Sequence, residues 1–288
     1  MLDANAPGRR SVLRRLPAVI STVLLALIAL CAAVFPMIAR VDLGATDLLN
    51  RLKPPVFEPG GSWAHPLGTD PLGHDYLVQL IYATRNSLGI SVAGMLIATV
   101  IGTLIGIVAG LWGGIADALL AFLVDVRLAV PSIVIATACA AFFGSTPQSL
   151  ILIIGLTGWA GFARIVRGEI LRLRELTFIV ASRSMGASRG RILVEHVLPN
   201  ISSLLIVNAT LQLNSFILLE SGLSFLGLGL QPPNVSLGLL ASKGRDYLID
   251  QWWLAVAPSL VIVFVIAQLT LLGDRLRDRS DPRLRPTS

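Results

Sequence analysis

The chain has 288 residues, of which 54% are hydrophobic and only 14% are charged, and its mean hydropathy is +0.76. A soluble domain of this length needs more polar surface than that, so the composition excludes an ordinary soluble protein and indicates an integral membrane protein. The net charge of +6 does not favour nucleic-acid binding, because the arginines cluster between apolar runs, as they do in the cytoplasmic flanks of membrane spans.

Six apolar stretches are long enough to cross a membrane, since about 20 helical residues span a hydrocarbon core of ~30 Å. In chain order the predicted spans are residues 18–38, 87–111, roughly 125–143, 148–165, 201–222 and 254–273. The first span follows four arginines and exceeds the apolar core of a cleaved signal peptide, so we interpret it as uncleaved. Asp117, Asp125 and Arg127 obscure where the third span begins.

The distribution of basic residues predicts how the spans are oriented. Four arginines precede the first span, seven lie from Arg164 to Arg191, and five lie from Arg275 to Arg285. Six spans place all three groups on one side, which the positive-inside rule makes the cytoplasm. We therefore expect a cytoplasmic tail at 1–17, an extracytoplasmic segment at 39–84, a core transmembrane domain of five helices at 85–274 with a cytoplasmic loop at about 164–199, and a cytoplasmic tail at 275–288.

The second predicted span carries a small residue at every fourth position. These residues are Gly94, Ala98, Gly102, Gly106 and Gly110. Such spacing places one smooth ridge along a helix, which lets another backbone approach closely. The pattern predicts helix–helix packing and leaves open whether the partner helix belongs to the same subunit or to another.

The basic loop between the fourth and fifth predicted spans is about 35 residues long, more than a simple connection needs. Its arginines could serve only to set topology. It also contains apolar residues such as Phe178 and Met185, which a purely solvated loop does not need. We interpret the loop as short helices that bend around Gly186, are closed by Leu198-Pro199, and offer an apolar surface to a partner.

Three separated motifs are similar to one family. Residues 181–188, "ASRSMGAS", followed by Ile192 and Leu198-Pro199, resemble the cytoplasmic signature of permease subunits of binding-protein-dependent ABC importers, although Val180 stands where that signature usually has Glu. Residues 65–88 and 220–233, "HPLGTDPLGHDYLVQLIYATRNSL" and "ESGLSFLGLGLQPP", resemble the C-type (DppC/OppC-like) permeases of dipeptide, oligopeptide and nickel importers.

The resemblance implies an all-α polytopic membrane protein with six transmembrane helices and the type I ABC importer permease (MetI-like) fold. Such a subunit works in the cytoplasmic membrane of a prokaryote with a second, B-type permease, two ATP-binding subunits or one fused ATPase, and an extracytoplasmic substrate-binding protein. The implied cargo is a short peptide, with nickel or another small cargo as the alternative.

The resemblance also makes the basic loop a coupling element that seats on an ATPase subunit. The residues implied for this contact are Phe178, Ala181, Ser182, Arg183, Met185, Gly186, Ala187, Ser188 and Arg189. The chain itself has no G-x-x-x-x-G-K-[ST] loop to cradle ATP phosphates, so we expect no enzyme and no cofactor here, with ATP and Mg²⁺ held by partner subunits.

Polar residues in the fifth predicted span are candidates for the translocation pathway. Asn208, Gln212 and Ser215 fall on one helical face, and polar groups in a membrane should face the bundle interior or a water-filled path. Lining the pathway and bridging helices are both compatible with this placement. Glu220, near the outer end, is a candidate for an outer gate or a structural hydrogen bond. A proton-coupled secondary carrier needs titratable groups deep in the membrane, and the chain offers mainly this one.

Four residues that lie close together on the outer side invite a metal hypothesis, namely His65, Asp70, His74 and Asp75. Their interleaved Pro-Leu-Gly sequences favour two tight turns with Asp70 bonding nearby amides, so we predict no metal site. The two cysteines lie in apolar runs, which excludes a disulfide framework or a cysteine-based zinc site.

Overall fold

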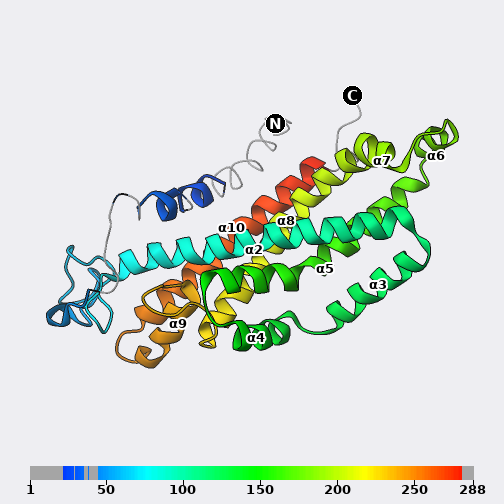
Figure 1. The fold of residues 1–288 in the computed structure, drawn as a ribbon. Helices are drawn as coiled ribbons and strands as arrows, with labels where there is room; N and C mark the ends of the chain where they lie inside the picture. Colours follow the sequence, from blue (N-terminus) through cyan, green and yellow to red (C-terminus); the bar gives the residue numbers. More distant parts are fainter. Residues whose placement is uncertain (1–21, 29, 36–37, 39–44, 281–288) are drawn as a thin grey trace, which may run out of the picture.

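A computed structural model describes residues 22–28, 30–35, 38 and 45–280 as a helical bundle (Figure 1). Within these residues the single β-interaction is an isolated bridge between Thr69 and Asp75. Four helical segments are long and apolar enough to cross a membrane, namely α2 (Tyr76–Trp112), α5 (Pro147–Arg174), the run Arg189–Phe225 that ends in α8 (Leu198–Phe225), and α10 (Trp253–Ser280).

Helices α2 and α5 share the most extensive interface in the molecule, and the stripe of small residues lies along it. A Cβ added to Gly102 would stand 2.4 Å from the carbonyl oxygen of Trp159, and one added to Gly106 would stand 2.8 Å from that of Ala163. Gly94 and Gly110 face α5 in the same way, and Ala98 is fully buried. The ridge therefore packs within this chain, because only a missing side chain lets the two backbones come so close.

The third predicted span is not one continuous helix. The chain instead forms α3 (Gly114–Ala129) and α4 (Ser132–Phe143), whose apolar parts are bent by 86° at the intervening break. The break lies at Val130-Pro131, where Val130 is extended. A proline disfavours helical geometry in the residue before it, which explains why the helix ends there. Counting the bent pair as one span gives five spans among the described residues.

The basic loop is shorter than predicted, because α5 extends to Arg174 and a new helix begins at Arg189. Between them lies α6 (Thr177–Ser184), which protrudes at one end of the bundle beside α7 (Arg189–Ile192) (Figure 1). We call this the α6 end.

The expected closure of the loop at Leu198-Pro199 is also wrong, because a π-helical turn at Leu193–Val197 joins α7 directly to α8. In this turn the N–H of Leu198 bonds the carbonyl of Leu193, five residues back. Pro199 has no N–H to donate and its ring crowds an ordinary α-helical turn. The wider turn just before it accommodates the proline without ending the helix.

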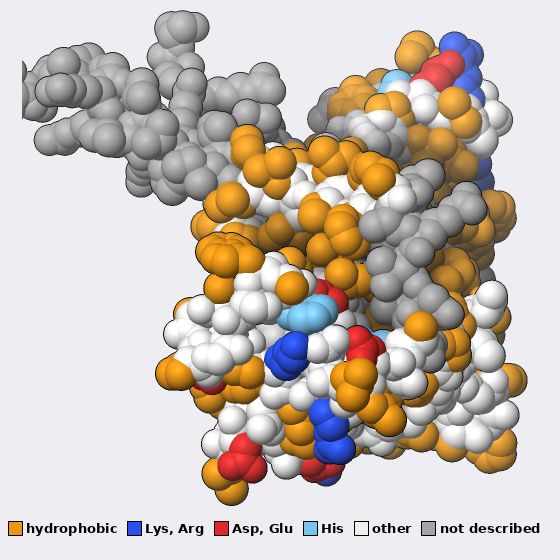
Figure 2. Space-filling model, turned by 90° about the vertical axis from the view of Figure 1, so that its left-hand side faces the viewer, with side chains coloured by type: hydrophobic (Ala, Val, Ile, Leu, Met, Phe, Trp, Pro, Cys, Tyr) orange, Lys and Arg blue, Asp and Glu red, His pale blue; other side chains and the backbone are white. Residues whose placement is uncertain are grey.

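The opposite end of the bundle carries residues 45–75, with a short 3₁₀ turn at Leu48–Asn50, and α9 (Leu237–Gly244) followed by a second 3₁₀ turn at Arg245–Tyr247. We call this the 45–75 end. Tyr76, Leu237 and Trp253 form a buried cluster beneath it. Figure 2 shows histidine, basic and acidic side chains among polar surface here, next to more apolar surface. Helix α2 starts at Tyr76, so the predicted boundary at residue 84 falls inside the helix.

The first predicted span lies partly outside the described residues. An apolar helix occupies Thr22–Phe35, and its Leu25 and Ile28 pack against a cluster that includes Leu213 of α8 and Val265 of α10. The predicted tail at 1–17 lies outside the described residues, as do residues 281–288 of the predicted C-terminal tail.

Candidate translocation cavity and coupling surface

A cavity of about 470 Å³ opens where the α3–α4 bend meets α5 and α8. Its lining combines apolar side chains with polar ones, and the polar members are Arg127, Ser132, Thr157, Gln212 and Ser215. Residues on both sides of the α3–α4 break contribute to this lining, Arg127 and Leu128 before it and Ser132 and Ile133 after it.

Arg127 lies in the last turn of α3 and links the three segments around the bend. Its Nη1 donates to the carbonyl of Val130 at 3.2 Å, and its Nη2 donates to the hydroxyl of Ser132 at 3.0 Å and to the carbonyl of Thr157 in α5. The Nε atom is buried and has no hydrogen-bond partner. A basic side chain is stabilising at a helix C-terminus, where carbonyl groups lack intrahelical donors.

Two of the four predicted pathway residues line this cavity. Gln212 and Ser215 are part of its wall, and the amide of Gln212 lies against Gly161, where an added Cβ would meet it at 2.8 Å. Asn208 does not line the cavity, since its side chain donates to the carbonyl of Leu204 in the same helix at 3.0 Å. Of the three residues predicted to share one helical face, Gln212 and Ser215 line the cavity and Asn208 bonds its own helix.

Glu220 also lies away from the cavity and is fully buried. Ser224 donates to its carboxylate at 2.8 Å and Ser221 at 3.4 Å, and the hydroxyls of Ser87 and Ser236 hydrogen-bond it too. Ser87 belongs to α2 and Ser236 is the N-cap of α9. The carboxylate therefore joins three elements through hydroxyl donors.

The same serines also satisfy backbone groups near Glu220. The hydroxyl of Ser87 accepts from the N–H of Leu237 at 3.1 Å, and that of Ser236 accepts from the N–H of Leu239 at 3.3 Å. A hydroxyl can donate one hydrogen bond and accept others, so Ser87 and Ser236 can each bond the carboxyl group and a backbone N–H at the same time. Burial of a polar group costs free energy unless it is hydrogen-bonded, which this arrangement provides.

The predicted coupling residues lie on α6 and the turn that follows, at the α6 end. Phe178 is 49% exposed and Met185 is 82% exposed. Of the remaining predicted residues, Ala181, Arg183, Gly186, Ser188 and Arg189 are exposed, and Ser182 and Ala187 are half-buried. Val180, which replaces the usual Glu, is also exposed, and its side chain cannot form an ion pair.

The inner side of this surface is anchored to the bundle. Ile179 of α6 and Ile192 of α7 are buried in a cluster with Val166 and Ile170 of α5. Arg174, at the end of α5, donates to the carbonyl of Gly110 in α2 at 2.8 Å. These contacts join α6 and α7 to α5, and Arg174 joins α5 to α2.

Gly186 closes α6 with a Schellman motif. Its N–H bonds the carbonyl of Arg183 at 3.0 Å, and the N–H of Ala187 bonds that of Ser182 at 3.1 Å. The φ of Gly186 is +89°, which favours glycine over any residue with a side chain. Ser188 then caps α7, accepting from the N–H of Arg191 at 3.3 Å. The predicted bend at Gly186 thus has a specific backbone geometry.

Four of the seven arginines assigned to the basic loop lie within α5, and two of these four pair with α3. Arg164 bonds Asp125 at 2.5 Å, and Arg167 makes two bonds to Asp117, at 2.5 and 2.9 Å. Both acidic residues had obscured the start of the third span. In the structure they hold α3 beside α5.

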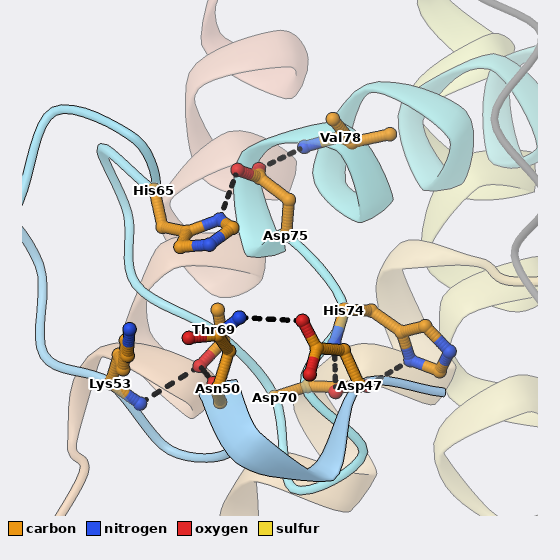
Figure 3. A network of polar contacts seen from close by, with 9 residues as sticks. All are labelled: Asp47, Asn50, Lys53, His65, Thr69, Asp70, His74, Asp75 and Val78. Carbon is orange, nitrogen blue, oxygen red and sulfur yellow. Dashed lines mark hydrogen bonds and ion pairs between the residues drawn. The ribbon is translucent and has the colours of Figure 1, made fainter. Parts of the chain in front are cut away.

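The histidine and aspartate residues at the 45–75 end make turns and helix caps (Figure 3). Asp70 accepts from the N–H groups of Leu72 and His74 at 2.8 and 2.9 Å, and from Nδ1 of His74 at 2.8 Å. Asp75 caps α2 through the N–H of Val78 and contacts Nδ1 of His65 at 3.0 Å. These bonds give each carboxylate a structural role in the described segment.

The pathway residues predicted from the sequence do not include Arg127, Ser132 or Thr157, which line the cavity. Arg127 was treated only as a charge that obscured a span boundary. An ionisable residue inside a membrane segment is by default a functional candidate, so that signal was present in the sequence. Ser132 and Thr157 carry no such signal, because hydroxyl groups in helices commonly bond their own backbone.

The family model "Binding-protein-dependent transport system inner membrane component" matches residues 102–286. The "Probable D,D-dipeptide transport system permease protein DdpC" of Escherichia coli K12 is 35% identical over 92% of this chain and 87% of its own. The "Di/tripeptide transport system permease protein DppC" of Pseudomonas aeruginosa is 35% identical over 90% and 86%.

Among solved structures, a chain of the inward-facing MetNI methionine ABC transporter has a TM-score of 0.58 at 19% identity, over 71% of this chain and 97% of its own. That likeness supports the MetI-like fold expected from the sequence motifs. The family match extends over more than half of the residues, and the two permeases cover most of the chain. This protein therefore belongs to the family of binding-protein-dependent transport system inner membrane components, which are multi-pass membrane proteins.

Proposed function

We propose that this chain is the permease subunit of an ABC importer for short peptides. The observation that carries the proposal is the polar cavity between the α3–α4 bend, α5 and α8. Polar side chains inside a membrane bundle are costly unless they face water, cargo or one another. The named relatives are permeases for dipeptides and tripeptides, which supports the same class of cargo here.

The proposed partners are inferred from the missing ATP-binding loop and from the exposed apolar residues at the α6 end. Its sequence has no G-x-x-x-x-G-K-[ST] loop, so ATP and Mg²⁺ would be held by two ATP-binding subunits or one fused ATPase. Exposed Phe178 and Met185 would provide the apolar centre of that contact, with Arg183 and Arg189 at its rim. A second, B-type permease would complete the pathway, and a substrate-binding protein would deliver cargo at the 45–75 end.

The orientation in the membrane follows from charge. Seven arginines between Arg164 and Arg191 lie towards the α6 end, and the positive-inside rule favours this end, with both termini, as cytoplasmic. The 45–75 end would then face the extracytoplasmic side.

The position of Glu220 favours one of the two roles considered for it. Its carboxylate is enclosed by serines of α2, α8 and the α9 cap, and it does not line the cavity. We therefore propose that Glu220 bridges helices, while Gln212 and Ser215 face the pathway.

The proposal is tested by reconstituting the chain with the B-type permease and the ATPase subunits in proteoliposomes, with the binding protein added outside. We expect ATP-dependent uptake of a labelled dipeptide and no ATPase activity from this chain alone. Labelled Ni²⁺ in the same vesicles tests the alternative cargo. Uptake of nickel but not peptide would overturn the peptide assignment, and uptake driven by a proton gradient without ATP would support a secondary carrier.

A further inference from the structure

Arg127 lies in the last turn of α3 and forms no ion pair with a described carboxylate. Its partner Thr157 lies ten residues beyond Pro147, the first residue of α5. At 1.5 Å of rise per residue this is ~15 Å along the helix, about half of a hydrocarbon core of ~30 Å. Arginine near this depth is expensive and marks a functional site by default.

The charge of Arg127 is not neutralised by any carboxylate in the described part of the chain. Its partners there are the carbonyls of Val130 and Thr157 and the hydroxyl of Ser132. The nearest acidic residue in sequence, Asp125, is paired with Arg164 instead. Bonds to neutral groups position a guanidinium and leave its full positive charge available to a ligand.

The donors of Arg127 are also incompletely used. A guanidinium has five N–H groups. Three are engaged by the partners above and the Nε–H is buried, which leaves one N–H at Nη1 for a ligand. Arg127 belongs to the wall of the cavity, together with Gln212 and Ser215 from α8. The volume of about 470 Å³ is typical of small-molecule sites, which range over ~300–1,000 Å³.

We propose that Arg127 binds a carboxylate of the cargo as it passes the α3–α4 bend, which for a short peptide is the C-terminal carboxylate. This inference rests on the proposed function. Guanidinium groups bind carboxylates with charge-assisted hydrogen bonds, which are about twice as strong as neutral ones. The amide of Gln212 and the hydroxyl of Ser215 can bond the polar groups of the peptide backbone. Every free peptide carries this carboxylate, so the contact suits cargo of varied side chains.

The competing explanation for Arg127 is a purely structural role, since its hydrogen bonds already link α3, α4 and α5 at the bend. The two explanations differ in their dependence on the cargo carboxylate. If Arg127 is only structural, its environment should not depend on whether the peptide ends in a carboxylate or an amide. If it binds the cargo, the carboxylate should be required.

The first experiment uses the assembled wild-type complex and phenylglyoxal, which modifies arginine. The modification rate of Arg127 is followed by mass spectrometry with no addition, with a dipeptide of two uncharged residues, or with its C-terminal amide. We expect the free acid at millimolar concentration to slow modification at least about fivefold and the amide to leave it nearly unchanged. Exposed Arg172, which is paired with Glu169 and lies outside the cavity wall, is the internal reference. Equal protection by both peptides, or by neither, would overturn the assignment.

The second experiment measures dipeptide uptake in the reconstituted complex. Arg127→Gln removes the charge and should lower uptake about tenfold or more, and Arg127→Lys should retain a larger share of it. Arg172→Gln is the matched control, because Arg172 is exposed, pairs with Glu169 of the same helix and does not line the cavity. Uptake by Arg127→Gln within twofold of wild type would refute carboxylate binding and leave the proposed function standing. Absence of peptide uptake by the wild-type complex would overturn both. If the Arg127→Gln complex does not assemble, the phenylglyoxal experiment on the wild-type complex distinguishes the two roles of Arg127.

Discussion

Gly186 is the residue at which the coupling surface depends on backbone conformation. Replacing it with leucine should weaken docking of the ATPase subunits, because a φ of +89° strains a residue with a side chain by ~1–3 kcal/mol. Apart from its chain neighbours, no atom of the described residues lies within 4 Å of an added Cβ, so the leucine would also occupy the space through which a partner would approach. At ~1.4 kcal/mol per tenfold change, we expect co-purification of ATPase subunits to fall about tenfold.

The matched comparison is Arg189→Ala at the exposed rim, where ion pairs are worth about 1 kcal/mol or less. It should reduce docking less than Gly186→Leu does. Normal uptake with Gly186→Leu, together with lost docking in Arg189→Ala, would show that the arginines carry the contact.

Glu220 is fully buried, so its carboxyl group depends on neighbouring serines for hydrogen bonds. Glu220→Gln keeps the size of the side chain but replaces an acceptor oxygen with an amide donor that faces serine hydroxyls. A buried polar group left without a hydrogen-bond partner costs ~1–3 kcal/mol, so we expect the free energy of unfolding in detergent to fall by about that amount.

Ser202→Ala provides the control for this loss, because the exposed Ser202 hydroxyl bonds only the carbonyl of Pro199 in the described structure. Its unfolding should resemble that of the wild type. A Glu220→Gln protein that is equally stable but takes up no cargo would instead support an outer gate.

At the scale of elements, the close contact of α2 and α5 sets the geometry of the bundle. Gly102→Ala should destabilise the protein, because the added Cβ would meet the carbonyl oxygen of Trp159 at 2.4 Å and neither backbone can yield alone. Overpacking of this kind typically costs ~1–3 kcal/mol, which thermal unfolding in detergent would detect as a lower Tm.

Gly89 lies in the same helix and has nothing within 4 Å of an added Cβ. Gly89→Ala should therefore leave Tm unchanged or raise it, since alanine favours helix over glycine by ~1 kcal/mol. Equal Tm values for the two variants would mean that the ridge does not pack as the structure places it.

At the scale of the whole molecule, the two ends should face opposite sides of the membrane. Cysteine is introduced singly at Ser62, Asp250 or Met185, all exposed, after Cys31 and Cys139 have been replaced. We expect an impermeant thiol reagent added to intact cells to label positions 62 and 250, and to label position 185 only after permeabilisation. Labelling of 185 in intact cells would invalidate the predicted orientation.

Local patterns in the sequence were enough to predict several features of the molecule. The apolar runs indicated long membrane helices, and the structure has four of these among its described residues. The position of Gly186 indicated a bend, since glycine reaches backbone angles that other residues avoid. The three motifs indicated the family, which the comparisons confirm. In each case the information lies within one segment of the chain.

The features that the sequence did not reveal depend on contacts between distant segments. The sharp angle between α3 and α4 depends on what packs beside Pro131, because a proline alone predicts a helix end and not a direction. Likewise, Arg127 became a cavity residue only when Thr157 of α5 and Gln212 of α8 were placed around it.

The sequence by itself determined that this protein spans a membrane, which face of the second span is smooth, and to which family it belongs. Its apolar length, small-residue spacing and motifs are properties of single segments. Only the tertiary structure decided that the smooth face packs on α5, that Glu220 is enclosed by serines of three elements, and that a bend opens a cavity beside Arg127. The physical reason is that packing and hydrogen bonding join residues far apart in the chain, and hydrophobic periodicity carries no information about which distant residues will meet.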